Sequence, residues 1–568
     1  MTPQPHTRAA IYFQTDAYST SGKKLMGRNA AGESFLKGYL RYSRADAFYS
    51  CVKHPDQAAE FESKVREYRT EPVSAITQEN LYHLTGAGTL FYPGPDIGTQ
   101  AHLRSLINPS GWSLCGITHT TSSAGVMDAV TGWLTTPVEP WDAIICTSRA
   151  VKQNVTALLQ AEANRLRQRL GIQRVILPKL PVIPLGINTD DFQFDPDQKA
   201  AARRALQADS NTVVILYMGR LSFHAKAHPL AMYQALETAA RNTEKKIKLV
   251  ECGWFSNDYI RNAFNDAAGT ACPSIEVVHL DGRDPHQRIT AWAGADIFCS
   301  LSDNIQETFG ITPVEAMAAG LPVVVSDWDG YKDTVRHNTD GFRIPTTMPP
   351  AGLSRDLAFR YATRVDTYDH YCGHTCMHAG VDIGETARAF ITLINDNELR
   401  QKMGAAGRQR ARETYDWSAI IPVYEDLWSH LGQIRTKAAK ENQKRPHPTP
   451  WPARMDPFTG FVHYPTATVT EDTLIARTEH DPDRSVQALQ KRVRLEMVKF
   501  AHQVIPDPET LTRLLKKIPS KPTAVKEIIE ADTPRGRALN HRAVCLLLKL
   551  GVVHHLPEKR QVAPGDLP

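Results

Sequence analysis

The chain has 568 residues, of which 42% are hydrophobic and 22% are charged. This composition excludes a disordered chain, and the length exceeds what one hydrophobic core supports, so we expect about two to four domains. The formal net charge is +5, and the segment from Asp481 to the end carries this excess, with sixteen Lys and Arg against ten Asp and Glu. Nucleic acid is not a favoured partner of this segment, because the charge is modest and few aromatic residues interleave it.

Cysteine usage and hydropathy give an expected compartment. The nine cysteines are an odd number scattered through apolar segments, which favours a reducing cytoplasm over a disulfide framework. The N-terminal stretch MTPQPHTRAAIYFQTDAY lacks the cationic start and apolar run of a signal peptide. No apolar run approaches the ~20 residues of a membrane helix. We therefore expect a cytoplasmic protein and leave open both peripheral contact with the inner face of the membrane and homo-oligomerisation.

The first part of the chain alternates apolar runs with helical segments. Strands are expected at 9–15, 46–52, 113–118 and 142–148, and helices at 33–44 and 148–170. This alternation predicts a Rossmann-like domain over residues 1–186.

The alternation is clearer from Asn211 to Pro345. Buried parallel strands are expected at 213–219, 247–253, 275–282, 296–302 and 321–327, with helical stretches between them. Units of about 25–30 residues are typical of a doubly wound sheet. We therefore predict an α/β protein with a second Rossmann-like domain over residues 187–411, facing the first across a cleft.

The composition changes beyond the second domain. A long helical stretch at 385–431 ends in a segment, 412–432, that we expect to tie the two halves together. Residues 433–470 are charged and then proline-rich, which is typical of a linker. Residues 471–568 turn helical again and predict a small helical or winged-helix-like accessory module.

The motif with the clearest chemistry is ETFGITPVEAMAAGLPVVVSDWDG, residues 307–330. Glu307 falls in a loop, and a helix is expected to begin around Gly310–Pro313. Free backbone N–H groups at such a helix start attract the phosphates of a diphosphate. Upstream, Arg220 and Lys226 follow the strand 213–219 at the edge where doubly wound sheets bind ligands. Two cations there can neutralise a diphosphate leaving group without a metal.

These residues resemble the E-x7-E motif of retaining glycosyltransferases of the GT-B fold, most closely family 4, also described as glycosyl transferases group 1. The similarity covers roughly residues 182–430 and, more weakly, the first half. The resemblance implies that Glu307 faces the hydroxyls of the donor hexose and that Glu315 holds the nucleotide ribose. It also implies that Gly310, Ile311 and Thr312 form the backbone turn at the phosphates and sugar. Ala227 departs from the family's glycine after Lys226, and His224 is unusual there.

Further donor-site residues follow from the same resemblance. His119, after the strand 113–118, matches a histidine that reaches the transferred sugar. Gly27 and Gly32, expected before a helix, resemble the family's glycine loop at the phosphates, although the family's adjacent glycine pair is absent. Gly282 and Arg283 lie where such enzymes seat the base by backbone groups. His119, Arg220, Lys226 and Glu307 are thus the candidate catalytic residues.

Two metal-like patterns receive no functional assignment. Asp327 and Asp329 imitate the metal-binding D-x-D of the other glycosyltransferase fold, but they end a buried strand. Cys372, His374, Cys376 and His378 alternate, whereas structural zinc sites use C-x2-4-C and H-x3-5-H spacing. A metal at these four residues stays open as the less favoured interpretation.

The resemblance implies a metal-independent enzyme that moves a hexose from a nucleotide diphosphate sugar with retention of configuration. UDP is the favoured carrier and GDP the next, and no cofactor is expected besides this substrate. The acceptor, a saccharide, lipid or protein, is expected on the first domain. A catalytically silent sensor of sugar nucleotides, with the C-terminal module as its output, is the alternative from another class. A phosphorylase that uses pyridoxal phosphate is a second enzymatic alternative.

Overall fold

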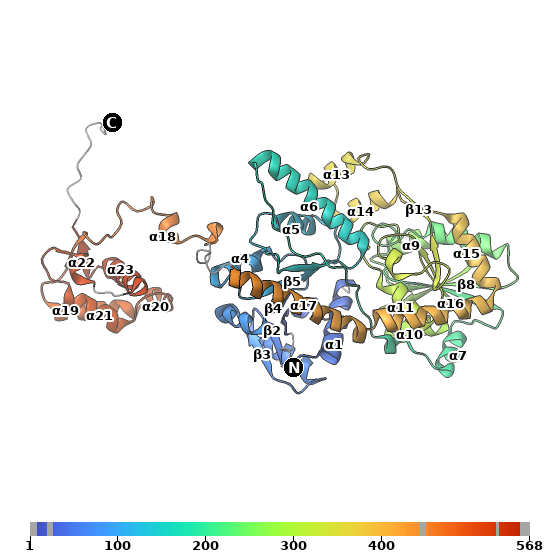
Figure 1. Cartoon of the computed structure of the whole chain (residues 1–568), viewed down its shortest axis with the longest axis horizontal. Helices are drawn as coiled ribbons and strands as arrows, with labels where there is room; N and C mark the ends of the chain where they lie inside the picture. Colours follow the sequence, from blue (N-terminus) through green and yellow to red (C-terminus); the bar gives the residue numbers. More distant parts are fainter. Residues whose placement is uncertain (1–7, 20–26, 442–449, 530–532, 557–568) are drawn as a thin grey trace. The chain divides into compact units, whose positions relative to one another are not determined.

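A computed structural model describes residues 8–19, 27–441, 450–529 and 533–556. The chain divides into a larger unit, Met1–Trp451, and a smaller unit, Pro452–Pro568, and each is described by itself (Figure 1). In the described residues, no helix combines the length and the apolar character that crossing a bilayer requires. All nine cysteines are described and are free thiols, and only Cys545 is exposed.

The first domain of the larger unit is built on a six-stranded sheet in the order β3-β2-β1-β4-β5-β6. All of its pairings are parallel. Its strands are β1 Ala10–Tyr12, β2 Phe48–Cys51, β3 Val73–Ile76, β4 Thr89–Phe91, β5 Ser113–Ile117 and β6 Ala143–Ile145. Four of these strands lie within the predicted ranges, whereas β3 and β4 were not predicted.

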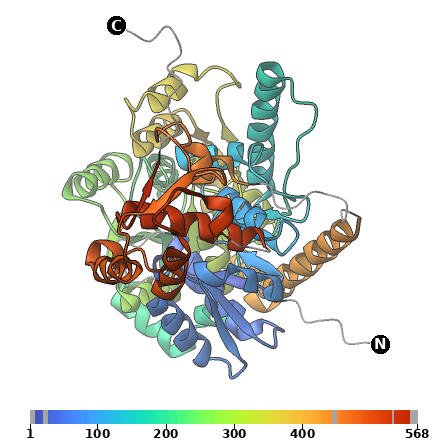
Figure 2. The same ribbon diagram turned by 90° about the vertical axis from the view of Figure 1, so that its left-hand side faces the viewer.

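Helices flank this sheet (Figure 2). Buried aromatic and aliphatic side chains fill the space between the helices and the sheet. The helices are α1 Gly27–Tyr42, α2 Pro55–Arg66, α3 Leu84–Ala87, α4 Gly98–Ile107, α5 Ala124–Gly132 and α6 Arg149–Leu170. Helix α6 begins where the Ser148 hydroxyl accepts a hydrogen bond from the Val151 amide, and it ends at Gly171 with φ 67°.

The second domain repeats this plan with a six-stranded sheet in the order β12-β11-β10-β7-β8-β9. Its pairings are again parallel. Its strands are β7 Thr212–Met218, β8 Lys246–Gly253, β9 Glu276–Asp281, β10 Ile297–Ser300, β11 Val323–Ser326 and β12 Gly341–Ile344. The two sheets with their flanking helices form two Rossmann-like domains, so the predicted GT-B architecture is confirmed.

The helices of the second domain follow its strands along the chain. They are α7 Pro196–Ala205, α8 Leu230–Ala240, α9 Asp258–Ala271, α10 Pro285–Gly294, α11 Ile311–Ala319, α12 Tyr331–Thr334, α15 Ile383–Asn395 and α16 Asn397–Arg410. Between β12 and α15 the chain makes an excursion, residues 346–382, which we call the insertion. It contains β13 Thr346–Thr347, α13 Arg355–Ala362, α14 Tyr368–Cys376 and β14 Gly380–Val381.

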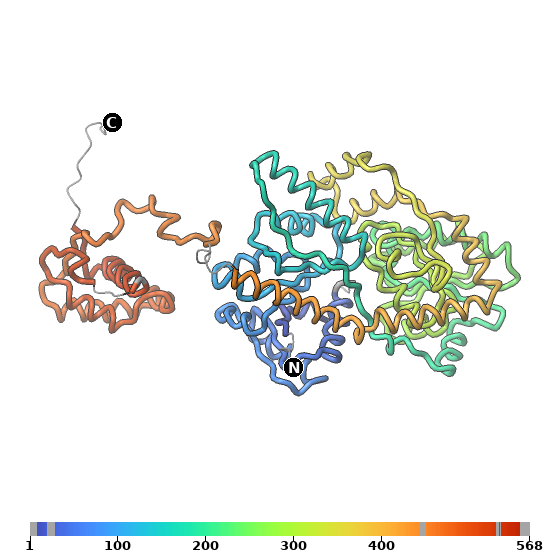
Figure 3. The backbone as a smooth tube through the Cα atoms, in the orientation of Figure 1, coloured from blue at the N-terminus to red at the C-terminus, as the bar shows by residue number. Residues whose placement is uncertain are grey.

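The long stretch predicted as helical at 385–431 is α15, α16 and α17, Trp417–Glu441, with a π-helical turn at Ala411–Tyr415 before α17. Figure 3 shows α17 running from the second domain along the first. Trp417 is buried against α1, where its indole N–H donates to the Ser34 hydroxyl at 2.8 Å. A Cβ on Gly38 would lie 2.3 Å from this indole, so the glycine allows the close approach. Helix α17 therefore packs into the core of the first domain, as expected of a segment that ties the halves together.

The smaller unit contains a sheet as well as helices, and its assignment as a winged-helix-like module stays a prediction. Its antiparallel sheet has the order β16-β15-β17. The elements are α18 Pro457–Gly460, β15 Leu474–Arg477, α19 Pro482–Val493, α20 Glu496–Lys499, α21 Pro508–Lys517, β16 Thr523–Ala524, α22 Val525–Ile528, α23 Pro534–Lys549 and β17 Val553–His555. The predicted linker begins inside α17, which continues to Glu441, and residues 442–449 of that linker lie outside the described residues.

Candidate active site

The site is built where strands of the second sheet end. Arg220 follows β7 directly, and its guanidinium donates to the Ala225 carbonyl at 3.0 Å and to the Gln306 side chain at 3.3 Å. The turn is tight, because a Cβ on Gly253 at the end of β8 would lie 1.9 Å from the Gly219 carbonyl oxygen. Arg220 therefore links the loop after β7 to the loop after β10, and its predicted contact with the diphosphate stays a prediction.

Lys226 and Glu307 form an ion pair between these same loops. The Lys226 ammonium lies 2.7 Å from a Glu307 carboxylate oxygen, and the glutamate side chain is only 10% exposed. Burial acts to raise the pKa of Glu307, but the charge and hydrogen bond of Lys226, with the amides of Thr308 and Phe309, outweigh it and lower the pKa. Glu307 is therefore ionised at neutral pH beside a cation that can also reach a phosphate.

The helix that follows begins as the sequence predicted. Helix α11 starts at Ile311, and its N-cap Gly310 has φ 78°. A Cβ at this position would lie 1.8 Å from the ring of Tyr331, so both conformation and space require glycine. Gly310 has no side chain to cap this helix start, which lies three residues after Glu307 in the chain and carries the positive end of the helix dipole.

Glu315 occupies the second turn of α11, with its side chain half-buried. Burial raises the pKa of Glu315 to about 7, and the charge of Arg288 opposes that rise. Arg288, on α10, also donates to the Gly282 carbonyl at 2.9 Å. Sequence reasoning missed Arg288, although a cation one turn into the helix after the 279–285 loop was a usable signal.

The loop predicted to seat the base is already hydrogen-bonded within the protein. The Gly282 amide donates to the Gly253 carbonyl at 2.9 Å. The Arg283 amide donates to the Asp281 carboxylate at 2.9 Å, and the Arg283 guanidinium pairs with the same carboxylate at 2.7 Å. Both amides therefore already have partners within the protein, and their part in seating the base stays a prediction.

Gly32 is not in a loop. Helix α1 begins at Gly27, so Gly32 lies within the helix, and the prediction of a glycine loop that extends to Gly32 is wrong. A Cβ on Gly32 would lie 1.9 Å from the Ala17 carbonyl oxygen, so this glycine allows the chain at 15–17 to pack against the helix. Residues 20–26, just before α1, lie outside the described residues.

His119 lies just beyond β5, at the carboxyl edge of the first sheet. Its Nε2 atom is 3.2 Å from the Pro93 carbonyl oxygen, to which it can donate a hydrogen bond. The next residue, Thr120, contacts Tyr368 of the insertion in the second domain. Its loop therefore reaches the second domain, and Tyr368 is a residue that sequence reasoning missed.

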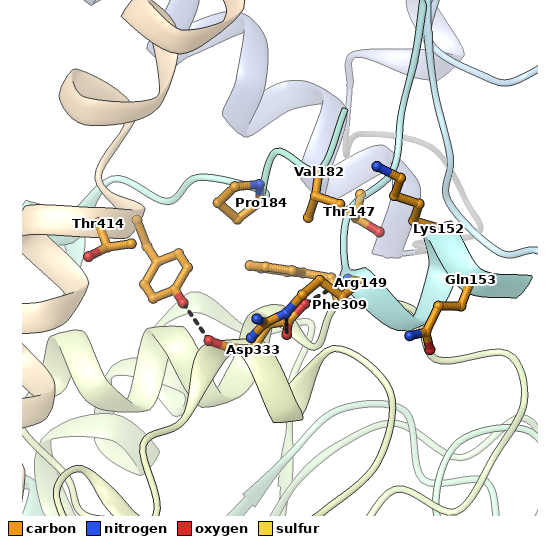
Figure 4. A pocket seen from close by; sticks show the side chains of 10 residues that line it. Thr147, Arg149, Lys152, Gln153, Val182, Pro184, Phe309, Asp333 and Thr414 are labelled. Atoms are coloured by element: carbon orange, nitrogen blue, oxygen red, sulfur yellow. Dashed lines mark hydrogen bonds and ion pairs between the residues drawn. The ribbon is translucent and has the colours of Figure 1, made fainter. Parts of the chain in front are cut away.

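Two further contacts join the domains beside a pocket of about 550 Å³. The Ser148 hydroxyl donates to Asp329 at 3.0 Å, and the Arg149 guanidinium pairs with Asp333 at 2.7 Å. Figure 4 shows Phe309, from the loop between Glu307 and Gly310, in the middle of this pocket with Arg149 beside it. The pocket thus adjoins the loop of Glu307, with cations from α6 on its rim.

The metal-like patterns take structural places. Asp329 bonds to Ser148 across the domains, and burial raises the Asp329 pKa to about 7. Cys372 and Cys376 are buried, whereas His374 pairs with Asp366 at 3.0 Å and His378 is exposed. Within the described parts of the chain, no three His, Cys, Asp or Glu side chains gather in a metal-binding group.

Comparison with protein families finds a match within the second domain. Residues 198–359 match the family described as Glycosyl transferases group 1. The matched segment runs from α7 into α13, and it contains Arg220, Lys226, Glu307 and Glu315. The second domain is therefore similar to group 1 glycosyltransferases in the part of the chain that holds the candidate donor site.

Two relatives extend the similarity. A phosphatidyl-myo-inositol mannosyltransferase of Mycobacterium leprae is 32% identical over 251 residues, 43% of this chain and 53% of that protein. A D-inositol 3-phosphate glycosyltransferase of Thermobispora bispora is 29% identical over 170 residues, 29% of this chain and 39% of that protein. The match to each thus spans about half of that relative's length or less.

Solved structures with a similar fold include HepE of Anabaena in complex with UDP and glucose. Its TM-score is 0.47 and its identity is 15%, over 74% of this chain and 100% of that chain. Sucrose-phosphate synthase from Thermosynechococcus elongatus has a TM-score of 0.44 and 17% identity, over 75% of this chain and 99% of that chain.

Proposed function

We propose that the protein is a glycosyltransferase that moves a hexose from a nucleotide diphosphate sugar to a hydroxyl acceptor. The observation that carries this proposal is the Lys226–Glu307 ion pair, at 2.7 Å, which joins the loop after β7 to the loop that leads into α11. Lys226 and the start of α11 would bind the diphosphate, and Glu307 would bind the sugar. The family match over residues 198–359 supports the same assignment.

The reaction would break the bond between the anomeric carbon and the diphosphate oxygen and form a bond to the acceptor oxygen. Negative charge grows on the leaving diphosphate, where Arg220, Lys226 and the start of α11 stabilise it. Glu307 orients the sugar through its hydroxyls. The acceptor proton passes to a departing phosphate oxygen on the same face, so the configuration is retained. His119, on the loop after β5 of the first domain, would bind the transferred sugar.

We infer that the sugar is carried by UDP or, as the second choice, by GDP. Glu315 would accept hydrogen bonds from the ribose hydroxyls. The acceptor would bind mainly to the first domain. The names of the two relatives, which refer to inositol phosphate and to phosphatidylinositol, favour a polyol or a lipid headgroup over a protein as acceptor. No cofactor beyond the donor and no divalent metal is needed in this mechanism, because Arg220, Lys226 and the helix start supply the positive charge.

Ligand-induced stabilisation tests the donor assignment. The full-length protein is heated with UDP, GDP, ADP and their hexose conjugates, with and without EDTA. A ligand at a hundred times its dissociation constant adds ~2.7 kcal/mol to stability. We expect a shift in melting temperature with one nucleotide diphosphate family, unchanged by EDTA and reduced in Arg220→Gln. A shift that requires a divalent metal would contradict the cation-based site, and no shift with any nucleotide would contradict the donor assignment.

A further inference from the structure

Three hydroxyl groups meet where the insertion of the second domain reaches the first domain. The Tyr368 hydroxyl on α14 lies 3.0 Å from the Thr120 hydroxyl and 2.9 Å from the Ser122 hydroxyl. The Thr120 and Ser122 hydroxyls are themselves 3.0 Å apart. Each group can donate one bond and accept others, so the three can form a closed ring of hydrogen bonds. The ring joins the loop after β5 to the insertion.

This loop carries His119, the residue before Thr120. A second tyrosine of the insertion holds the other end of the loop, because the Ala124 amide donates to the Tyr361 hydroxyl at 2.8 Å. The loop from His119 to Ala124 is therefore bonded to the second domain at both of its ends. Its position relative to the donor site depends on the insertion.

The insertion is fixed to the donor side of the site as well. Gly373 of α14 packs so closely on the loop after β7 that a Cβ there would lie 2.9 Å from the His224 Cβ. The Cys376 sulfur lies 3.8 Å from the Phe223 carbonyl oxygen and 3.3 Å from the Gly373 carbonyl oxygen of its own helix. The His224 carbonyl in turn accepts from the Asn304 side chain at 2.9 Å, in the loop that leads to Glu307. Helix α14 thus rests on the donor loops and presents Tyr368 to the His119 loop.

We propose that Tyr368 is a positioning residue, whose hydroxyl holds the His119 loop in register with the donor loops. This inference rests on the proposed function and deepens it, because it assigns the insertion to the assembly of the reaction centre. The family match ends at residue 359, so α14 lies outside the segment that matches the family. Cys372 and Cys376 of the same helix are buried.

The test removes the hydroxyl oxygen of Tyr368 and keeps its aromatic ring. In Tyr368→Phe, the ring contacts of α14 persist while both hydrogen bonds to the loop are lost. Tyr371→Phe is the matched control, since Tyr371 lies on the same helix and stacks on Tyr361 at 4.3 Å through its ring. No hydrogen bond of its hydroxyl occurs among the described residues.

Hydrogen–deuterium exchange of the full-length protein measures directly how well the backbone amides of the His119 loop are protected from solvent. We expect amides of residues 119–124 to exchange about ten-fold faster in Tyr368→Phe, as two lost bonds of ordinary strength imply. The Tyr371→Phe control should match the wild type. Equal exchange in all three proteins would overturn the proposal. This measurement requires no turnover, so it stands even if the proposed transferase activity fails its own test.

Kinetics then separate positioning from general stability. We expect kcat for transfer to fall about ten-fold in Tyr368→Phe with a much smaller change in the donor KM, because the variant loses one contact to Gln306 whereas Lys226 and Glu307 keep their ion pair. Thr120→Val should cause a similar loss of kcat. The double variant, Tyr368→Phe with Thr120→Val, should lose little more than either single variant, because both substitutions break the same group of hydrogen bonds. Additive losses, or faster exchange with unchanged kcat, would contradict a positioning role.

Discussion

Lys226 and Glu307 face each other at 2.7 Å, although they are assigned to different parts of the donor. The ion pair keeps a nearly buried carboxylate charged at the place proposed for the sugar hydroxyls. A bound diphosphate would compete with Glu307 for the Lys226 ammonium. The two residues are therefore coupled, and changing one alters what the other can bind.

Glu307→Gln tests this coupling in a binding measurement. The amide keeps the shape of the side chain and releases Lys226, so the affinity for the nucleoside diphosphate should stay equal or rise about three-fold. Isothermal titration of the preferred nucleotide into wild type and variant measures it. Glu244→Gln, at an exposed glutamate of the same domain, is the control and should change nothing. Binding ten-fold weaker in Glu307→Gln would mean that Glu307 holds the nucleotide itself.

Gly310→Ala should damage both stability and donor binding. The left-handed conformation at φ 78° costs a non-glycine residue ~1–2 kcal/mol, and the added methyl would meet Tyr331 at 1.8 Å. Thermal unfolding should shift down by at least a few degrees. The control is Gly269→Ala in α9, where the added methyl meets nothing within 4 Å. That variant should be as stable as the wild type or slightly more stable, and equal losses in both would count against this account of the helix start.

Glu315→Gln gives a pH-dependent prediction. Burial raises the pKa of Glu315 to about 7, so between its ordinary value and 7 the folded protein holds a proton that the unfolded chain releases. The contribution of Glu315 to stability is therefore lost as pH rises through this window. The variant should melt at the wild-type temperature near pH 5 and about 1–2 °C above it at pH 8. The same difference at both pH values would contradict a raised pKa.

The sequence predicted those parts of the fold that depend on local pattern. Residues 213–219 and 247–253 are continuous apolar runs, and they are β7 and β8. The start of α11 followed from Gly310, and the structure confirms it. Strand β3 was not predicted, because its middle residues are exposed at the sheet edge and leave no apolar run in the sequence.

The parts that were missed depend on contacts distant in sequence. Gly32 was predicted to lie in a loop. Its actual role, allowing the chain at 15–17 to pack against α1, depends on a contact that the local sequence does not indicate. Tyr368 and Thr120 are separated by 248 positions, and no local pattern relates them. The pairing of Lys226 with Glu307 likewise appears only when β7 and β10 lie side by side in the sheet.

A chain ended after Trp451 should keep the donor site. It retains α17, whose buried residues from Trp417 to Leu431 belong to the core of the first domain. We expect it to bind the nucleotide with wild-type affinity by titration. A chain ended after Arg410 lacks α17 and should fail to fold. Loss of nucleotide binding in soluble, folded protein ended at Trp451 would assign the smaller unit to the active site.

Turnover of the donor tests the central claim most directly. The full-length protein is incubated in EDTA with UDP- and GDP-hexoses and a panel of polyol and lipid acceptors, and release of the nucleoside diphosphate is followed by chromatography. We predict release that depends on an acceptor, a product with the anomeric configuration of the donor, and a fall of at least about a hundred-fold in Glu307→Gln. Turnover that persists in Glu307→Gln, or a nucleotide that binds tightly and is never turned over by the wild type, would contradict the account.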